Sequence, residues 1–132
     1  MSETVLFVCQ LNMVRSPMAE GIAQKQGFMA QSCGLEPGDV DELMLAVMRE
    51  VGIDMSAHQP KSLQDFADQT FDRVVAFSHD TKDAAEAVLG PDAPVELWTV
   101  PNPSSASYDV RAIMDNYRAI RSVITNRLSR LS

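Results

Sequence analysis

The sequence has few of the features that mark disulfide-stapled, metal-binding or membrane proteins. It contains two cysteines among 132 residues, too few for a disulfide framework, and shows no zinc-ligand spacing. No apolar run approaches the roughly 18 residues that a membrane-spanning helix needs. The N-terminal segment carries Glu3 and lacks the basic region of a secretion signal. We therefore expect a protein of the reducing cytoplasm, with no membrane association, no metal and no other cofactor.

Basic residues are also scarce. Lys and Arg number 11 against 18 Asp and Glu, which gives a formal net charge of -7. This balance argues against nucleic acid and anionic membranes as partners, and it weakly repels phosphorylated substrates. A hydrophobic content of 45% and a charged content of 22% are typical of a soluble globular protein. The length suits one domain with a real core, which we expect to span residues 1–132.

The most informative stretch covers residues 4–20. The uncharged run over 5–8 is rich in β-formers and predicts a strand buried on both faces. Ser16-Pro17 then predicts the start of a helix, with Ser16 as N-cap and Glu20 near the positive end of its dipole. A loop that runs from a strand into a helix N-terminus points backbone amides inward. We therefore expect this loop to bind a tetrahedral oxyanion.

The side chains of this loop suit phosphate chemistry. Cys9 opens the loop, and a thiol in this positive field is expected to react as a thiolate at neutral pH. Arg15 can bind two phosphate oxygens in a bidentate fork, and Ser16 can hydrogen-bond the sulfur. Asn12 tolerates the left-handed backbone that such loops often need. A cysteine at a strand end is usually a small hydrophobic residue, but these neighbours favour a nucleophile.

The motif Val-Leu-Phe-Val-Cys-x-x-Asn-x-x-Arg-Ser-Pro-Met-Ala-Glu at residues 5–20 resembles the N-terminal signature of the low-molecular-weight protein tyrosine phosphatase superfamily. That superfamily also contains the thioredoxin-linked arsenate reductases. The resemblance implies that Cys9 is the nucleophile, that Ser16 assists its thiolate and that Arg15 binds the oxygens of the oxyanion. It also implies a phosphate-binding loop made of Gln10, Leu11, Asn12, Met13, Val14 and Arg15. The family usually has Gly where this chain has Leu11, and Leu is costly if that position needs a positive φ.

Strands and helices alternate along the rest of the chain. We expect strands over 5–8, 28–33, 71–77 and 94–97, and helices over 17–26, 63–67, 81–89 and 108–131, with another that opens at Asp39 or Asp41 and ends near 51. This alternation predicts an α/β fold with a four-stranded parallel sheet. The resemblance implies the strand order 2-1-3-4, helices on both faces and the phosphate-binding loop after strand 1. Cys33 is expected to be structural, and His58 to be a surface or loop-anchoring group rather than a base.

Hydrolysis in this superfamily proceeds through a cysteinyl phosphate, and one Asp of an Asp-Pro dipeptide transfers both protons. The matching dipeptide here is Asn102-Pro103. Asn cannot transfer a proton, and general acid–base help is typically worth about 10²–10⁴-fold. We therefore expect weak hydrolysis, confined to aryl phosphates with good leaving groups. Other candidate acids are Asp109, His79 and Asp80, of which Asp80 is alternatively a helix cap.

Three functions remain open from the sequence. The first is a phosphomonoesterase that acts on phosphotyrosine-like aryl phosphates of proteins or small molecules, with inorganic phosphate or arsenate as a ligand. The second is a non-catalytic oxyanion or phosphoprotein-binding module, which Leu11 and Asn102 favour. The third is an arsenate reductase, because residues 51–63 resemble those enzymes. Since no cysteine follows residue 33, Cys33 or an external thiol would have to complete that reaction.

Overall fold

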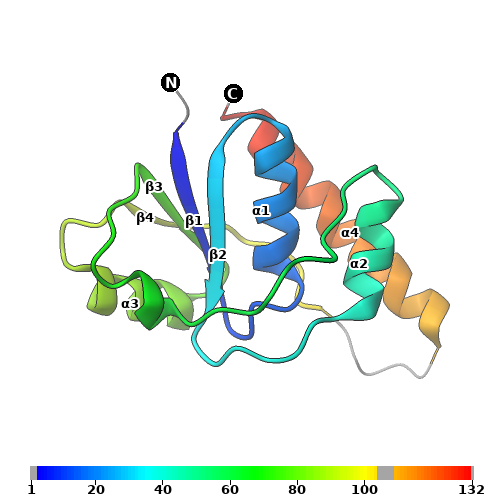
Figure 1. The fold of residues 1–132 in the computed structure, drawn as a ribbon, viewed down its shortest axis with the longest axis horizontal. Helices are drawn as coiled ribbons and strands as arrows, with labels where there is room; N and C mark the ends of the chain where they lie inside the picture. The colour runs from blue at the N-terminus through cyan, green and yellow to red at the C-terminus, as the bar shows by residue number, and fades with distance from the viewer. Residues whose placement is uncertain (1–2, 104–108, 132) are drawn as a thin grey trace.

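The computed structural model describes residues 3–103 and 109–131 (Figure 1). Its elements in chain order are β1 (Thr4–Cys9), α1 (Arg15–Lys25), β2 (Met29–Gly34), α2 (Glu42–Arg49), the 3-10 helix η1 (Leu63–Phe66), β3 (Arg73–Ala76), α3 (His79–Leu89), β4 (Val95–Leu97) and α4 (Val110–Ser129). Every expected element is present, with ends that shift by one or two residues. The expected start of the last helix, at 108, lies outside the described residues.

The strands form one parallel sheet in the order β2-β1-β3-β4, which confirms the predicted topology. β1 lies inside the sheet, and Val8 pairs with Cys33 on one side and Ala76 on the other. The chain leaves β1 toward β2 and later returns to β3 on the opposite side. Ligands of open α/β sheets bind where the strand order reverses in this way, beyond the carboxyl ends of the strands. Cys9 is the last residue of β1 and stands at that point.

Helices cover both faces of the sheet, as predicted. α1, α2 and α4 pack on one face, and α3 lies on the other (Figure 1). β1 contributes to both cores with a period of two: Phe7 and Cys9 face the first, and Leu6 and Val8 face the second. Cys33 belongs to the second core. The two cysteine side chains therefore lie on opposite faces of the sheet.

The start of α1 differs from the expectation. The helix begins at Arg15 after Val14, whose side chain makes no capping hydrogen bond, so Ser16 is not the N-cap. Ser16 is fully buried in the first turn, and its hydroxyl contacts Cys9 instead. Glu20 lies beyond the first turn and accepts a hydrogen bond from Ser32 (2.8 Å). The serine hydroxyl therefore serves the loop rather than the helix terminus.

The caps of the other helices follow the usual chemistry. Asp41 is the N-cap of α2, so of the two expected starts, Asp39 and Asp41, the second is correct. Ser78 caps α3 through a capping box with Thr81, so the expected cap by Asp80 is wrong. Asp80 lies one residue inside the helix because α3 begins at His79.

Side-chain hydrogen bonds and ion pairs join α2 to α4. Arg118 and Arg121 of α4 both donate to Glu50 at the end of α2, with bonds of 2.7 Å and 2.9 Å. These hydrogen bonds, that of Arg118 first, lower the pKa of Glu50 to about 2. Tyr117 donates to Asp41 at the start of α2 (2.6 Å). The two helices are thus joined at both ends of α2.

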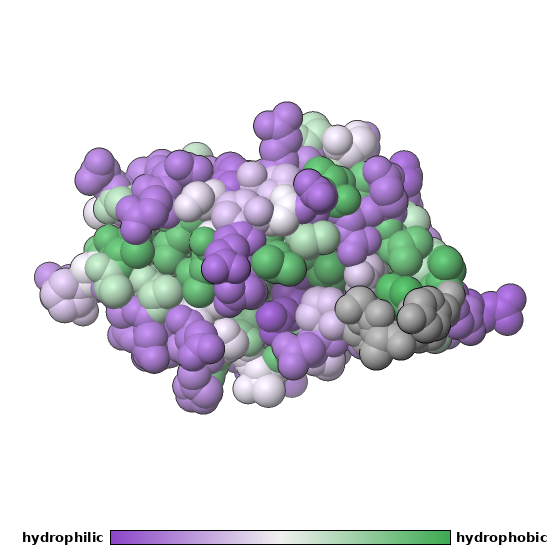
Figure 2. Space-filling view, turned by 90° about the horizontal axis from the view of Figure 1, so that it is seen from below, coloured by the Kyte–Doolittle hydropathy of each residue, from purple (hydrophilic) through white to green (hydrophobic). Residues whose placement is uncertain are grey.

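Figure 2 looks onto the end of the molecule toward which the strands point, where apolar surface runs between polar side chains. Leu11 contributes to the exposed apolar surface, with 43% of its area accessible. Within residues 3–103 and 109–131, no helix has the length and apolarity needed to cross a bilayer.

Candidate active site

The loop after β1 is held from outside by the segment that follows β2. The hydrogen bonds run from the amide of Leu35 to the carbonyl of Cys9 (3.2 Å), from Glu36 to Gln10 (2.9 Å) and from Gly38 to Leu11 (3.0 Å). The carbonyl of Asn12 lies 3.1 Å from Nε2 of His58. Four successive carbonyls of the loop therefore point outward.

This arrangement decides where the loop amides point. In a trans peptide the N–H is directed opposite to the preceding carbonyl. The amides of residues 10–13 consequently face the inner side of the loop, and none of them has an acceptor among the described residues. The N-terminus of α1 adds its dipole to the same side. The backbone thus forms a ring of inward-facing amides, which is the geometry expected of an oxyanion-binding loop.

Asn12 fixes the shape of the loop. It has a φ of 56° and is the one non-glycine residue of the described chain in the left-handed region, as the sequence indicates. Its side chain accepts from the amide of Lys61 (2.9 Å) and donates to Ser16 (2.8 Å). Leu11 has no positive φ, so the expected cost of replacing the usual Gly does not arise.

His58 anchors the loop, as expected. The ring is buried, and because a carbonyl can only accept, Nε2 must donate to Asn12. Nδ1 of His58 is buried without a hydrogen-bond partner in the described structure. His58 is therefore a support of the loop rather than a base at its centre.

Gly34 lets the two segments approach. A Cβ at this position would lie 2.8 Å from the backbone nitrogen of Asn12 and from the backbone carbon of Leu11. Both contacts are closer than real Cβ atoms make, and both involve backbone that cannot rotate away. Gly34 is therefore needed where β2 passes the loop.

The sulfur of Cys9 contacts a hydroxyl placed for it. Sγ lies 2.9 Å from Oγ of Ser16. Since Asn12 already donates to this hydroxyl, the single hydroxyl proton of Ser16 is free to point at the sulfur or, less closely, at the carbonyl of Cys33 (3.4 Å).

Arg15 is buried beside Cys9. Its Nη1 donates to Oδ1 of Asn102 (3.0 Å) and to the carbonyl of Phe77 (3.3 Å), and its guanidinium lies over the Phe77 ring. Burial lowers the pKa of Arg15, and the nearby Cys9 raises it. Because these bonds use Nη1 alone, Nη2 and Nε have no partner among the described residues. They remain available for an anion.

Asn102 and the other candidate acids do not line the pocket that contains Cys9, although Asn102 contacts Arg15, which does. The side-chain oxygen of Asn102 accepts the hydrogen bond from Arg15, so the residue expected at the acid position lies next to the guanidinium. His79 and Asp80 are exposed in the first turn of α3, and Asp109 caps α4 by accepting from the amide of Arg111. None of these three lines the pocket that contains Cys9.

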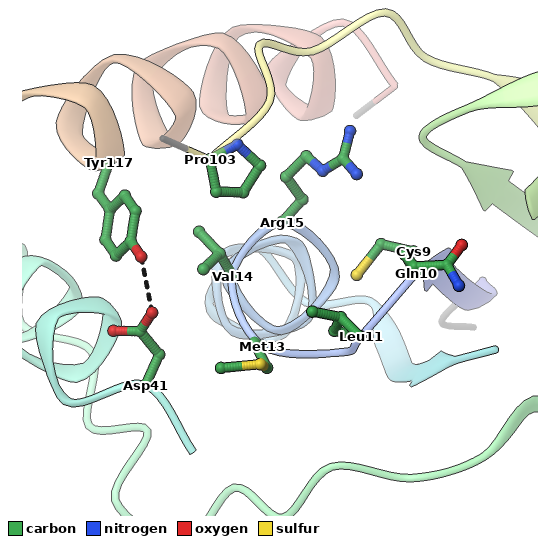
Figure 3. Close-up of a pocket in the computed structure, with 9 residues that line it drawn as sticks. All are labelled: Cys9, Gln10, Leu11, Met13, Val14, Arg15, Asp41, Pro103 and Tyr117. Carbon is green, nitrogen blue, oxygen red and sulfur yellow. Dashed lines mark hydrogen bonds between the residues drawn. The ribbon is translucent and has the colours of Figure 1, made fainter. Parts of the chain in front are cut away.

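That pocket has a volume of about 260 Å³ (Figure 3). It is lined by Cys9, Gln10, Leu11, Met13, Val14, Arg15, Asp41, Pro103 and Tyr117. Sequence reasoning missed both Asp41, which it considered only as the start of a helix, and Tyr117. No local signal could have found them, because their contact joins positions 76 apart.

Cys33 is isolated from the site chemistry. Its side chain is fully buried in the second core, and burial, followed by the charge of Cys9, raises its pKa strongly. The expectation of a structural role is consistent with this environment. No group of His, Cys, Asp or Glu in the described part of the chain is arranged to hold a metal ion.

Comparison with known proteins assigns the family. Residues 4–132 match the family described as low molecular weight phosphotyrosine protein phosphatase. The chain belongs to this family. The structure has the features that the resemblance of residues 5–20 to this family implied. These are a loop after β1, the strand order of the sheet and a cysteine at the end of β1.

The named relatives of this phosphatase-family protein include reductases. It is 31% identical to a glutaredoxin arsenate reductase of Synechocystis sp., over 96% of this chain and 94% of the relative. It is 28% identical to an arsenate reductase of Staphylococcus xylosus, over 80% of this chain and 82% of the relative. The family is one of enzymes, and these names leave the specific reaction open.

Solved structures of both kinds share the fold. An arsenate reductase in the phosphate binding state aligns with a TM-score of 0.78 and 29% identity, covering 98% of this chain and 95% of its own. The tyrosine phosphatase amsI of Erwinia amylovora aligns with a TM-score of 0.78 and 22% identity, covering 98% of this chain and 90% of its own. The second likeness concerns the fold alone.

Gly34→Ala should damage the oxyanion loop. The added methyl group meets loop backbone, so we expect the affinity for inorganic phosphate, measured by isothermal titration calorimetry, to fall at least about tenfold. Gly38→Ala is the matched control, because there the new methyl meets first the flexible Met13 side chain. Equal phosphate affinity in the Gly34 variant and the unmodified protein would contradict this role of Gly34.

Proposed function

We propose that this family member is a cytoplasmic phosphomonoesterase that hydrolyses phosphotyrosine-like aryl phosphates. The observation that carries the proposal is the pocket, in which a nucleophile and an anion-binding loop open directly onto apolar walls. Leu11, Met13, Val14 and Pro103 supply those walls, and an aromatic ring suits them. A cavity of about 260 Å³ leaves room for a ring beside the phosphoryl group. The substrate is a phosphorylated protein or a small aryl phosphate.

The first step is attack of sulfur on phosphorus. Cys9 forms a bond to phosphorus as the bond to the aryl oxygen breaks, and the phenolate leaves. The amides of residues 10–13 and the guanidinium of Arg15 would stabilise the equatorial oxygens in the transition state. Water then attacks phosphorus, and the Cys9 sulfur leaves with help from the Ser16 hydroxyl, 2.9 Å away. The products are a phenol and inorganic phosphate.

The missing acid limits the substrate range. Asn102 occupies the acid position beside Arg15 and cannot donate a proton to the leaving oxygen. A phenolate leaves without help more readily than an alkoxide does, since a phenol has a pKa near 10. We therefore expect slow turnover of aryl phosphates and hardly any of alkyl phosphates.

Arsenate reduction with an external thiol is the second candidate. The names of the relatives at 31% and 28% identity favour it. The placement of Cys33 on the opposite face of the sheet from Cys9 argues against an internal disulfide, so thiols such as glutathione would have to supply both electrons. In that reaction arsenate becomes arsenite, and two external thiols become a disulfide.

Replacement of the nucleophile is the first test. Cys9→Ser should remove all hydrolysis of p-nitrophenyl phosphate in a spectrophotometric assay, because no other thiol reaches the pocket. Cys33→Ala, which removes a buried thiol from the second core, should keep the activity. Unchanged turnover in the Cys9 variant would rule out the mechanism. Tight phosphate binding by the unmodified protein without any turnover would indicate a binding module instead.

Asn102→Asp tests the acid position. The new carboxyl would lie beside Arg15, whose charge lowers a neighbouring carboxyl pKa. Because only the protonated form can donate, the gain in kcat for phenyl phosphate should be about tenfold or more near pH 5 and should shrink toward pH 7. Asn102→Ala should give no gain. Absence of a pH-dependent gain in the Asp variant would place the acid elsewhere.

Thiol consumption separates the second candidate from the first. If the protein reduces arsenate, then arsenate should drive glutathione oxidation that depends on Cys9 and is unchanged in Cys33→Ala. A coupled assay with glutathione reductase measures this rate. Loss of reduction in the Cys33 variant, with the fold intact by circular dichroism, would contradict the external-thiol route.

A further inference from the structure

The pocket has two polar ends that differ in charge. Cys9 and Arg15 lie at one side of the view in Figure 3, Asp41 and Tyr117 lie at the other, and Val14 stands between them. The first end binds anions through the loop amides and the guanidinium. The second carries the carboxylate of Asp41. A ligand that fills the pocket therefore meets an anion site and an acidic wall at the same time.

Asp41 is held in this position from two sides. Its Oδ1 accepts from the amides of Leu43 (2.9 Å) and Met44 (3.1 Å) at the start of α2. Its Oδ2 accepts from the hydroxyl of Tyr117 (2.6 Å). Tyr117 is buried, and burial together with this hydrogen bond raises its pKa, so it stays a neutral donor. The carboxylate is a fixed part of the wall rather than a mobile surface charge.

This wall opposes a substrate that carries negative charge alone. An aryl phosphate brings negative charge into a pocket whose far end is already negative, in a protein of net charge -7. Arg15 is the one cationic side chain among the lining residues of the described chain, and it lies at the other end. A cation on the substrate beside the ring would convert the repulsion into attraction.

We propose that Asp41 is a specificity residue that selects phosphotyrosine flanked by Lys or Arg. This inference rests on the proposed aryl phosphate site. The acidic wall would hold an ammonium or guanidinium group of the peptide while the loop holds the phosphoryl group. Peptides with acidic neighbours would be excluded by the same carboxylate.

Binding to the Cys9→Ser protein tests the inference without any need for turnover. The probes are two phosphotyrosine peptides of identical sequence except for Arg or Glu on both sides of the phosphotyrosine. Calorimetry at low ionic strength should show that the Arg peptide binds about fivefold or more tightly. Adding Asp41→Asn should remove most of this preference. Asn remains a good N-cap, so α2 should stay folded.

Two further variants separate the pocket carboxylate from the general charge of the protein and from its hydrogen bond to Tyr117. Asp39→Asn removes the same charge from an exposed position of the same loop that does not line the pocket, and it should keep the preference. Tyr117→Phe removes the donor and leaves the carboxylate, so it should keep or enlarge the preference. If the Asp41→Asn protein fails to fold, the peptide preference of the Tyr117→Phe protein still tests the inference.

Several results would overturn the inference. They are an equal affinity for the two peptides, a preference that survives Asp41→Asn, an equal loss in Asp39→Asn, a loss in Tyr117→Phe, or no binding of either peptide. Turnover of p-nitrophenyl phosphate by the unmodified protein reports on the proposed hydrolysis separately. Charge-selective binding without turnover would support the role of Asp41 and contradict hydrolysis.

Discussion

The site depends on the outward direction of four consecutive carbonyls. Segment 34–38 and His58 hold the carbonyls of residues 9–12 from outside, and the planar trans peptide then turns the amides of residues 10–13 inward. Gly34 permits the close approach, and Asn12 provides the single left-handed residue in the loop. Because the protein carries a net charge of -7, we infer that anion binding would depend locally on these amides and on the guanidinium of Arg15.

Around the loop, Arg15 concerns anion binding and Asn102 concerns proton transfer. Arg15 is buried and held by the neutral Asn102, so a carboxylate does not compete with an incoming anion for its guanidinium. The same Asn leaves proton transfer to the leaving oxygen without a donor. Under the proposed function, the site would bind oxyanions through the amides and Arg15, whereas cleavage would depend on the leaving group. A similar solved structure, an arsenate reductase at 29% identity, is described in a phosphate binding state.

Local signals in the sequence were enough for the strands, the helices and the left-handed backbone at Asn12, and the family resemblance supplied the strand order of the sheet. They failed where a side chain had a distant partner. Ser16 has the composition of an N-cap, but the sulfur and Asn12 use its hydroxyl. The concern over Leu11 disappears because Asn12 takes the positive φ. The pairing of Asp41 with Tyr117 depends on how α2 meets α4, which no local pattern encodes.

We propose that Cys9, beside the Ser16 hydroxyl and a ring of inward-facing loop amides that binds anions, is a reactive nucleophile. Alkylation by iodoacetate at neutral pH, followed by mass spectrometry of the modified peptide, tests it most directly. We expect rapid modification of Cys9, strong slowing by inorganic phosphate, and no reaction at the buried Cys33. Slow alkylation of Cys9 that phosphate leaves unchanged would contradict the claim.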